Sequence, residues 1–211
     1  MAKARDIDLV LIRVGSTAWD DAERVSGSCD LPLSERGLEQ MRALAAKTGA
    51  DHPLGVTLCG CDEASRQTAE LFCEKLGGRV RSLEDLNGVS LGLWEGLRIQ
   101  ELDEKFPTAA RQWREDPSSV TPPSGESLAE AQDRLLTELV RTIEKCKCEG
   151  GTGIGIALRP IAFSILLSTI DDRPLNDLWS VQVEAEEVVH RRVTREQVRS
   201  WRDRVRQPAA R

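Results

Sequence analysis

Two short, almost wholly aliphatic segments constrain the fold of this chain more than any other feature. Residues 7–12 (Ile-Asp-Leu-Val-Leu-Ile) and 154–158 (Ile-Gly-Ile-Ala-Leu) each have the length of a strand. Neither shows the regular apolar and polar alternation of a strand that has one face in water. Such runs are typical of central strands in parallel sheets, which are buried on both faces. The sequence therefore predicts a sheet with helices on both sides.

Helical patterns alternate with further strand-like runs along the chain. Ser34 precedes an amphipathic stretch that stops near Gly49, and a second helix is expected from about residue 62 to residue 76. The remaining expected elements are strands at 56–59 and 80–83, a helix that ends at Gly150, a helix at 160–169 and a late strand at 181–189. This alternation predicts a three-layer α/β/α sandwich with a mostly parallel central sheet.

The length of 211 residues fits one sizeable α/β domain, and neither a repeat nor a linker interrupts it. We expect a single domain over residues 1–211, with its core at about 6–190 and a basic C-terminal tail at about 191–211. Acidic residues interrupt that tail at Glu196 and Asp203, so we interpret it as a solvated face.

Charge and hydropathy exclude several classes of partner. The chain has 29 basic and 35 acidic residues and a net charge of −6, which argues against a nucleic-acid partner. The first eight residues carry charges where a signal peptide would be apolar, and the apolar run at 161–170 is too short to span a bilayer. We therefore expect a cytoplasmic protein without a membrane partner, whose six cysteines are mostly reduced.

Several motifs follow one another in a fixed order. Residues 9–19 read LVLIRVGSTAW, to be compared with the signature L-x-x-x-R-H-G-E-T-x-W. The later motifs are a G-x-x-D-x-P-L block at 27–33 that continues to Gln40, RQTA at 66–69, GLWEG at 92–96, PPSGES at 122–127 and a strand-helix segment at 156–167. In this order and at these spacings the motifs resemble the histidine phosphatase superfamily, of the phosphoglycerate mutase-like type.

The resemblance implies both a fold and a reaction. Members of the family have the α/β/α sandwich predicted above and transfer a phosphoryl group through a phosphohistidine. A neutral imidazole attacks phosphorus while cationic side chains stabilise the charge on the transferring oxygens. A carboxylic acid protonates the leaving oxygen, and a second histidine completes the phosphate pocket.

Four of the five positions that would carry this chemistry are changed. Where the resemblance places the nucleophilic histidine, the second pocket arginine, the proton donor and the second histidine, this chain has Val14, Ala64, Gly88 and Arg159. Only the first pocket arginine is kept, as Arg13. Loss of such a nucleophile can cost about 10⁶ in rate, and loss of a general acid a further ~10²–10⁴. The sequence therefore predicts a pseudoenzyme without a catalytic residue.

No neighbouring residue is an easy replacement. Arg66 lies two residues beyond Ala64, and two residues along a helix turn a side chain by about 200° to the opposite face. The two histidines are His52, which precedes an expected strand on the side away from its carboxyl end, and His190, which is expected on the surface after the late strand.

Two interpretations of the remaining cleft stay open. In the first, Arg13 and Arg159 project from adjacent strands and clamp a phosphate or carboxylate, with Ser16 and Thr17 as additional donors. In the second, the Val14 side chain fills the phosphate pocket that the resemblance implies, and Arg159 pairs with an acidic neighbour such as Glu126.

The functional hypotheses follow from these two interpretations. The leading one is a pseudophosphatase that acts as an anion-binding or interaction module and needs no cofactor. The alternatives are a phosphomonoesterase with weak or rearranged activity and a structural protein-interaction subunit.

The cysteines raise a separate question. Cys59 and Cys61, together with Cys146 and Cys148, have spacings that suggest a zinc site, but the inferred topology places the two pairs at opposite ends of the sheet. A cluster of Cys29, Cys59 and Cys61 at the mouth of the cleft is the other arrangement considered. We interpret these residues as reduced thiols and expect no metal.

Overall fold

A computed structural model describes residues 6–48, 53–145 and 152–206 of the chain. Its centre is a sheet in which parallel strands follow the order β3-β2-β4-β1, and β5 pairs with the outer side of β1 in the antiparallel direction. The strands are β1 (Ile7–Arg13), β2 (Leu54–Cys59), β3 (Arg79–Ser82), β4 (Gly153–Leu158) and β5 (Val188–Val193). The predicted mostly parallel sheet is confirmed.

The two aliphatic runs are the adjacent strands β1 and β4, paired in register from Leu9 opposite Ile154 to Arg13 opposite Leu158. Their side chains alternate between two apolar layers, as successive strand residues do. Leu9 and Leu11 belong to one buried cluster, while the residues between them on the other face belong to a second. Burial on both faces explains why neither run shows polar alternation.

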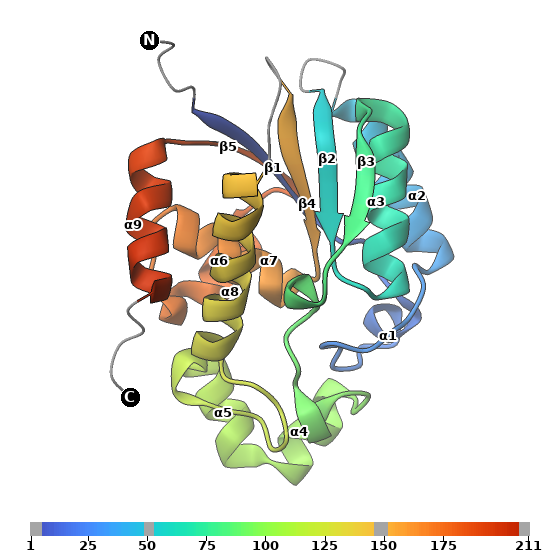
Figure 1. The fold of residues 1–211 in the computed structure, drawn as a ribbon. Helices are drawn as coiled ribbons and strands as arrows, with labels where there is room; N and C mark the ends of the chain where they lie inside the picture. Colours follow the sequence, from blue (N-terminus) through green and yellow to red (C-terminus); the bar gives the residue numbers. More distant parts are fainter. Residues whose placement is uncertain (1–5, 49–52, 146–151, 207–211) are drawn as a thin grey trace.

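Helices form the two outer layers (Figure 1). One face is covered by α2 (Glu35–Lys47) and α3 (Glu63–Leu76), and the other by α6 (Leu128–Lys145), α7 (Pro160–Ile170), α8 (Leu178–Glu184) and α9 (Arg195–Arg206). Beyond the carboxyl ends of the parallel strands lie α1 (Ala18–Asp21), α4 (Ile99–Lys105) and α5 (Pro107–Glu115). The expected three layers are therefore present.

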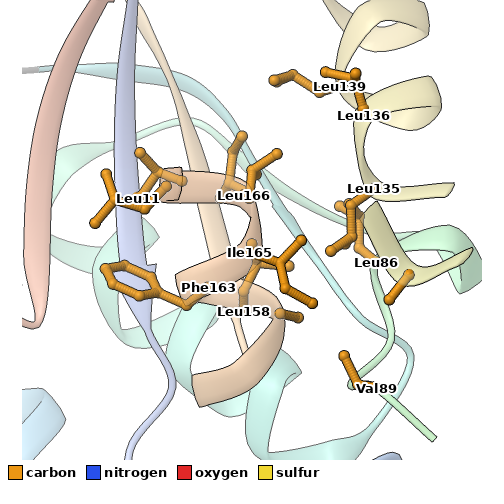
Figure 2. Close-up of a cluster of buried hydrophobic side chains, with 14 of the residues drawn as sticks. Leu11, Leu86, Val89, Leu135, Leu136, Leu139, Leu158, Phe163, Ile165 and Leu166 are labelled. Atoms are coloured by element: carbon orange, nitrogen blue, oxygen red, sulfur yellow. The ribbon is translucent and has the colours of Figure 1, made fainter. Parts of the chain in front are cut away.

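The larger cluster fills the space between the sheet and the helices α6 and α7. Figure 2 shows Leu11 of β1 beside Phe163 and Leu166 of α7, with Leu135 of α6 on the far side of α7. This burial explains why α7 is apolar almost all round: its residues 162–170 are all buried.

The helix starts follow the capping residues of the sequence. Ser34 Oγ accepts a hydrogen bond from the Gly37 N–H at 3.2 Å, and Asp62 Oδ1 accepts one from the Ser65 N–H at 3.1 Å. Each bond satisfies an N–H group that a helix leaves free in its first turn. The expected cap at Ser34 is confirmed.

Two expectations near the C-terminus are wrong. The late strand predicted at 181–189 begins with the last residues of the helix α8, and the strand β5 begins only at Val188. The core also extends past residue 190, because Val193, Val198 and Trp201 are buried in the larger cluster. Over its described residues, 191–206, the basic segment is therefore the end of β5 followed by the amphipathic helix α9 packed on α6.

Within the part of the chain that the structure describes, every helix is too short or too polar to cross a membrane.

Candidate functional site

Val14 occupies the position that the resemblance assigns to the nucleophile. It follows β1 at the carboxyl edge of the sheet, and its N–H donates to the Leu158 carbonyl at 2.9 Å. Its side chain is only 4% exposed and belongs to the apolar cluster that contains Leu33 and Met41. An isopropyl group has no lone pair, so this position offers core packing and no nucleophile.

Arg13 is held by backbone carbonyls of a distant segment. Its Nη1 donates to the Gln182 carbonyl at 2.8 Å and its Nη2 to the Ala185 carbonyl at 2.9 Å. The guanidinium carbon also lies 5.6 Å from the centre of the Phe163 ring, within the range of a cation–π contact. Both terminal nitrogens therefore fix the end of α8, and the structure does not join Arg13 to Arg159 as a clamp.

The second arginine position is closed as well. Ala64 is fully buried in the first turn of α3, and its N–H donates to the Leu31 carbonyl at 3.0 Å. Arg66 lies on the solvent side of the helix, where it pairs with Glu63 and Glu70. It supplies no charge to the carboxyl edge of the sheet, as the helical geometry predicts.

Gly88 is buried where the resemblance places the proton donor. A Cβ atom at this position would lie 2.3 Å from the Gly27 carbonyl oxygen and 3.2 Å from Arg159 Cγ. Gly27 is confined in turn, because a Cβ there would meet a Glu95 carboxylate oxygen at 2.3 Å. The backbone of residues 27 and 88 therefore fills the space that a carboxylic acid would need.

Arg134 of α6 anchors the segment that carries Gly88. Its guanidinium donates to the carbonyls of Asp85, Asn87 and Gly88 at 2.9–3.0 Å and to both carboxylate oxygens of Glu126. The ion pair with Glu126 is 2.6 Å long. Glu126, the acidic neighbour expected for Arg159, is therefore engaged by a different arginine.

Arg159 lies between β4 and α7, where the resemblance places the second histidine. Its side chain is 4% exposed, and Nη2 lies 3.8 Å from Oδ2 of Asp20, a contact too long for a hydrogen bond. Its Nε and Nη2 atoms have no hydrogen-bond partner among the described residues. A guanidinium with unpaired N–H groups is costly to bury, so an acceptor at this place would be favourable.

Asp20 is fixed by the residues that precede and follow it. Its Oδ2 accepts from the Thr17 N–H at 2.8 Å and from the Thr17 hydroxyl at 2.6 Å, and its Oδ1 accepts from Ser26 at 2.8 Å. Thr17, the N-cap residue of α1, is fully buried, and its hydroxyl proton is already donated to Asp20. Ser16 is half-buried, and its carbonyl accepts from the Ser34 N–H at 2.9 Å.

A cavity of about 540 Å³ lies next to Arg159. This volume is typical of small-molecule sites. Its polar lining includes Asp20, Arg159 and Gln182, and Arg24 and Arg114 also contribute to it. The apolar lining comes from α4, α5, α7, α8 and the segments around residues 25 and 90: Val25, Val89, Leu91, Ile99, Leu102, Ala110, Trp113, Ile161 and Trp179.

The described cysteines are free thiols in different surroundings. Cys59 was expected at the mouth of the cleft but is fully buried, with its sulfur 3.5 Å from the Ser82 hydroxyl, and burial raises its pKa to about 11. Cys61 is exposed, and desolvation raises its pKa. Burial also raises the pKa of Cys29, although the nearby positive charge of Arg159 partly opposes this.

Cys29 and Cys59 have different neighbours. Cys29 interacts electrostatically with Arg159, Glu95 and Asp20, whereas Cys59 contacts β3. Among the described residues, no group of three or more His, Cys, Asp or Glu side chains is arranged to hold a metal ion. Cys146, Cys148 and His52 lie outside the described residues. His190 is exposed within β5, where it pairs opposite Val10, and does not follow the strand as expected.

Sequence reasoning did not identify Asp20, Arg134 or the aromatic wall of the cavity. The Thr-x-x-Asp spacing of residues 17–20 is a capping-box pattern and signals the position of Asp20. The contact of Asp20 with Arg159, and the five hydrogen bonds of Arg134 described above, join distant segments and have no local sequence signal.

Comparison with known proteins places these features in a family. The family model of the histidine phosphatase superfamily (branch 1) matches residues 9–204. Phosphoserine phosphatase 1 of Hydrogenobacter thermophilus is 31% identical over 129 residues, 61% of each chain. Glucosyl-3-phosphoglycerate phosphatase of Mycobacterium tuberculosis is 35% identical over 135 residues, 63% of this chain and 60% of the relative. The chain thus spans about three fifths of the length of these two relatives.

A longer match and a solved structure agree with this assignment. Probable phosphoglycerate mutase GpmB of Serratia proteamaculans is 30% identical over 169 residues, 78% of this chain and 74% of the relative. The native structure of mycobacterial glucosyl-3-phosphoglycerate phosphatase has a TM-score of 0.73 and 25% identity, covering 83% of this chain and 84% of that structure. The chain belongs to the histidine phosphatase superfamily, branch 1.

Proposed function

We propose that this protein is a non-catalytic histidine-phosphatase-like protein, whose pocket at the carboxyl edge of the sheet binds an anionic ligand through Arg159. The observation that carries the proposal is the packing of Val14, an aliphatic side chain 4% exposed in a closed apolar cluster. A nucleophile at this position needs a lone pair directed at phosphorus. The close approach of the Gly27 backbone to Gly88 leaves no room for a side chain at residue 88, which supports the absence of a proton donor there.

The binding half of the proposal rests on Arg159. Its buried Nε and Nη2 atoms are unpaired, and it borders a cavity of about 540 Å³. An anion that accepts hydrogen bonds from this guanidinium would replace the solvation that burial removes. Since Arg13 is engaged by the carbonyls of residues 182 and 185, the proposal assigns the charge of the site to Arg159 alone.

A second candidate is a phosphomonoesterase with weak or rearranged activity. It is favoured by the names of the similar proteins, among them phosphoserine phosphatase 1 and glucosyl-3-phosphoglycerate phosphatase. A rearranged enzyme would still need cationic groups to stabilise the transferring phosphoryl oxygens. At the carboxyl edge of the sheet, Arg159 is the residue that would have to supply this positive charge.

Hydrolysis of p-nitrophenyl phosphate separates the two candidates. We expect the wild type to release p-nitrophenol at the rate of the protein-free blank, because loss of the nucleophile alone costs about 10⁶ in rate. The matched variants are Arg159→Met and Val14→His, of which the second restores only one of the changed positions. Wild-type turnover that disappears in Arg159→Met would contradict the non-catalytic function and support the second candidate.

A further inference from the structure

The cavity beside Arg159 has one buried charged end and mostly apolar walls. Trp113 of α5 and Trp179 of α8 both line it, with their ring centres 5.5 Å apart in an edge-to-face arrangement. Leu91, Leu102 and Ile161 add aliphatic surface from three other segments. A wall of this kind stabilises an apolar or aromatic body more than a sugar, whose hydroxyl groups would need hydrogen-bond partners.

Two residues of the cavity lining carry buried polar atoms that have no hydrogen-bond partner among the described residues. Arg159 is 3% exposed and carries unpaired donors at Nε and Nη2. Gln182 carries an unpaired, buried acceptor at Oε1, although its backbone carbonyl is occupied by Arg13. A ligand with an anionic acceptor and one N–H or O–H donor would satisfy both groups.

The start of α7 favours an anion at the same end. Arg159 is the N-cap of this 11-residue helix, and Pro160 and Ile161 of its first turn also line the cavity. The N-terminus of a helix carries partial positive charge and free N–H groups. The unpaired guanidinium and the helix terminus therefore act in the same direction.

The charge balance favours one negative charge over two. Among the described residues that line the cavity, Arg159 is the buried cation, and the Asp20 carboxylate already lies 3.8 Å from it. Arg24 is only partly buried and keeps its charge while it donates to the neutral Gly96 carbonyl, and Arg114 is exposed and pairs with Asp103 at 2.6 Å. A dianionic phosphate ester would bring a second charge to a site with a single buried guanidinium and an acidic neighbour.

From these observations we infer that the cavity binds a monocarboxylate with an aromatic or branched apolar body and one N–H or O–H donor. The carboxylate pairs with Arg159, the apolar body lies against Trp113 and Trp179, and the donor meets Gln182 Oε1. This inference rests on the proposed function and names its ligand class. It also fits a cavity lining in which Arg159 is the one buried cation among the described residues, whereas a phosphoryl group needs several.

Calorimetric titration of the whole chain with a matched set of small molecules tests the ligand class. Indole-3-acetate supplies a carboxylate, an aromatic body and one N–H group. Indole-3-acetamide removes the charge, 1-methylindole-3-acetate removes the donor, acetate removes the body, and inorganic phosphate tests the proposed function separately. We expect indole-3-acetate to bind most tightly and the amide to bind at least about tenfold more weakly, the effect of losing a charged hydrogen bond.

Three variants locate the binding. Arg159→Met removes the charge while keeping the length of the side chain, and Ile161→Trp fills the cavity without changing Arg159. Each is expected to weaken indole-3-acetate binding at least about tenfold. Val183→Trp is the matched control, because Val183 is 86% exposed beside Gln182 and should leave the affinity unchanged. Circular dichroism checks that each variant is folded. If Arg159→Met does not fold, the affinity of Ile161→Trp decides the test.

The outcomes separate this inference from the proposed function. Binding of phosphate that depends on Arg159, without binding of indole-3-acetate, overturns the ligand class and leaves the proposed function standing. Failure of phosphate, acetate and indole-3-acetate to bind at millimolar concentration overturns both. Equal affinity for indole-3-acetate and its amide overturns the assignment to Arg159, and equal affinity for the 1-methyl compound overturns the donor requirement.

Discussion

Replacing Gly88 with glutamate is expected to destabilise the protein by about 3 kcal/mol or more, and not to restore a proton donor. A Cβ atom at this position would lie 2.3 Å from a backbone oxygen of Gly27, which cannot rotate away as a side chain can. Gly27 has no room to withdraw, because it is packed against Glu95 and the Val89 carbonyl. Arg134 also holds the Gly88 carbonyl through a 3.0 Å hydrogen bond.

Urea unfolding measures this effect, and two smaller substitutions identify its cause. Gly88→Ala carries the same Cβ without a charge and should account for most of the destabilisation. Gly55→Ala is the matched control, because the nearest atom to a Cβ there is the Thr152 side-chain oxygen at 3.1 Å, and the backbone oxygen of Gly153 lies 3.9 Å away. Its unfolding free energy should stay within about 1 kcal/mol of the wild type. A Gly88→Ala variant as stable as the Gly55→Ala variant would contradict the close packing of the segments around residues 27 and 88.

Trp94→Ala is expected to lower the free energy of unfolding by about 3–5 kcal/mol. Trp94 is fully buried, and its ring centre lies 5.8 Å from that of Trp113 and 6.4 Å from that of Phe106. Trp113 in turn contacts Trp179, so this aromatic cluster joins α5, α8 and the junction between α4 and α5. Removing the indole leaves a cavity at the centre of the elements that wall the binding site.

The adjacent Leu93 provides the control for this prediction, because its side chain is 63% exposed. Leu93→Ala should change the free energy of unfolding by no more than about 0.5 kcal/mol. Chemical unfolding followed by far-ultraviolet circular dichroism measures both variants. A Trp94→Ala variant with the stability of Leu93→Ala would show that the aromatic cluster does not hold this part of the fold together.

The central sheet could be predicted from the sequence because β1 and β4 are buried on both faces, which makes their residues almost uniformly apolar. The segment at 181–189 misled the same reasoning. Val181 and Val183 alternate with polar residues as in a strand, yet Leu178 and Val181 are buried at the i, i+3 spacing of a helix packed on α7. Packing against α7 therefore favoured the helix over the strand that the alternating pattern predicts.

The departures from the family motifs at Val14, Ala64, Gly88 and Arg159 are visible in the sequence, whereas the directions of the arginine side chains are not. Arg13 turns toward carbonyls that lie 169 and 172 residues later in the chain. Glu126 pairs with Arg134, and Asp20 lies beside Arg159. The partner of each arginine depends on which side chains the completed fold brings together, and no local sequence pattern indicates that partner.

The covalent step of phosphoryl transfer provides the most direct test of the central claim, which is that the phosphoryl-transfer site has been lost. The measurement is the intact mass of the wild-type protein after rapid quenching from p-nitrophenyl phosphate, with mycobacterial glucosyl-3-phosphoglycerate phosphatase as the positive control. With Val14 at the nucleophile position, the account predicts that no phosphate is attached to this protein at any time point. A phosphorylated intermediate that forms and decays during turnover would contradict it.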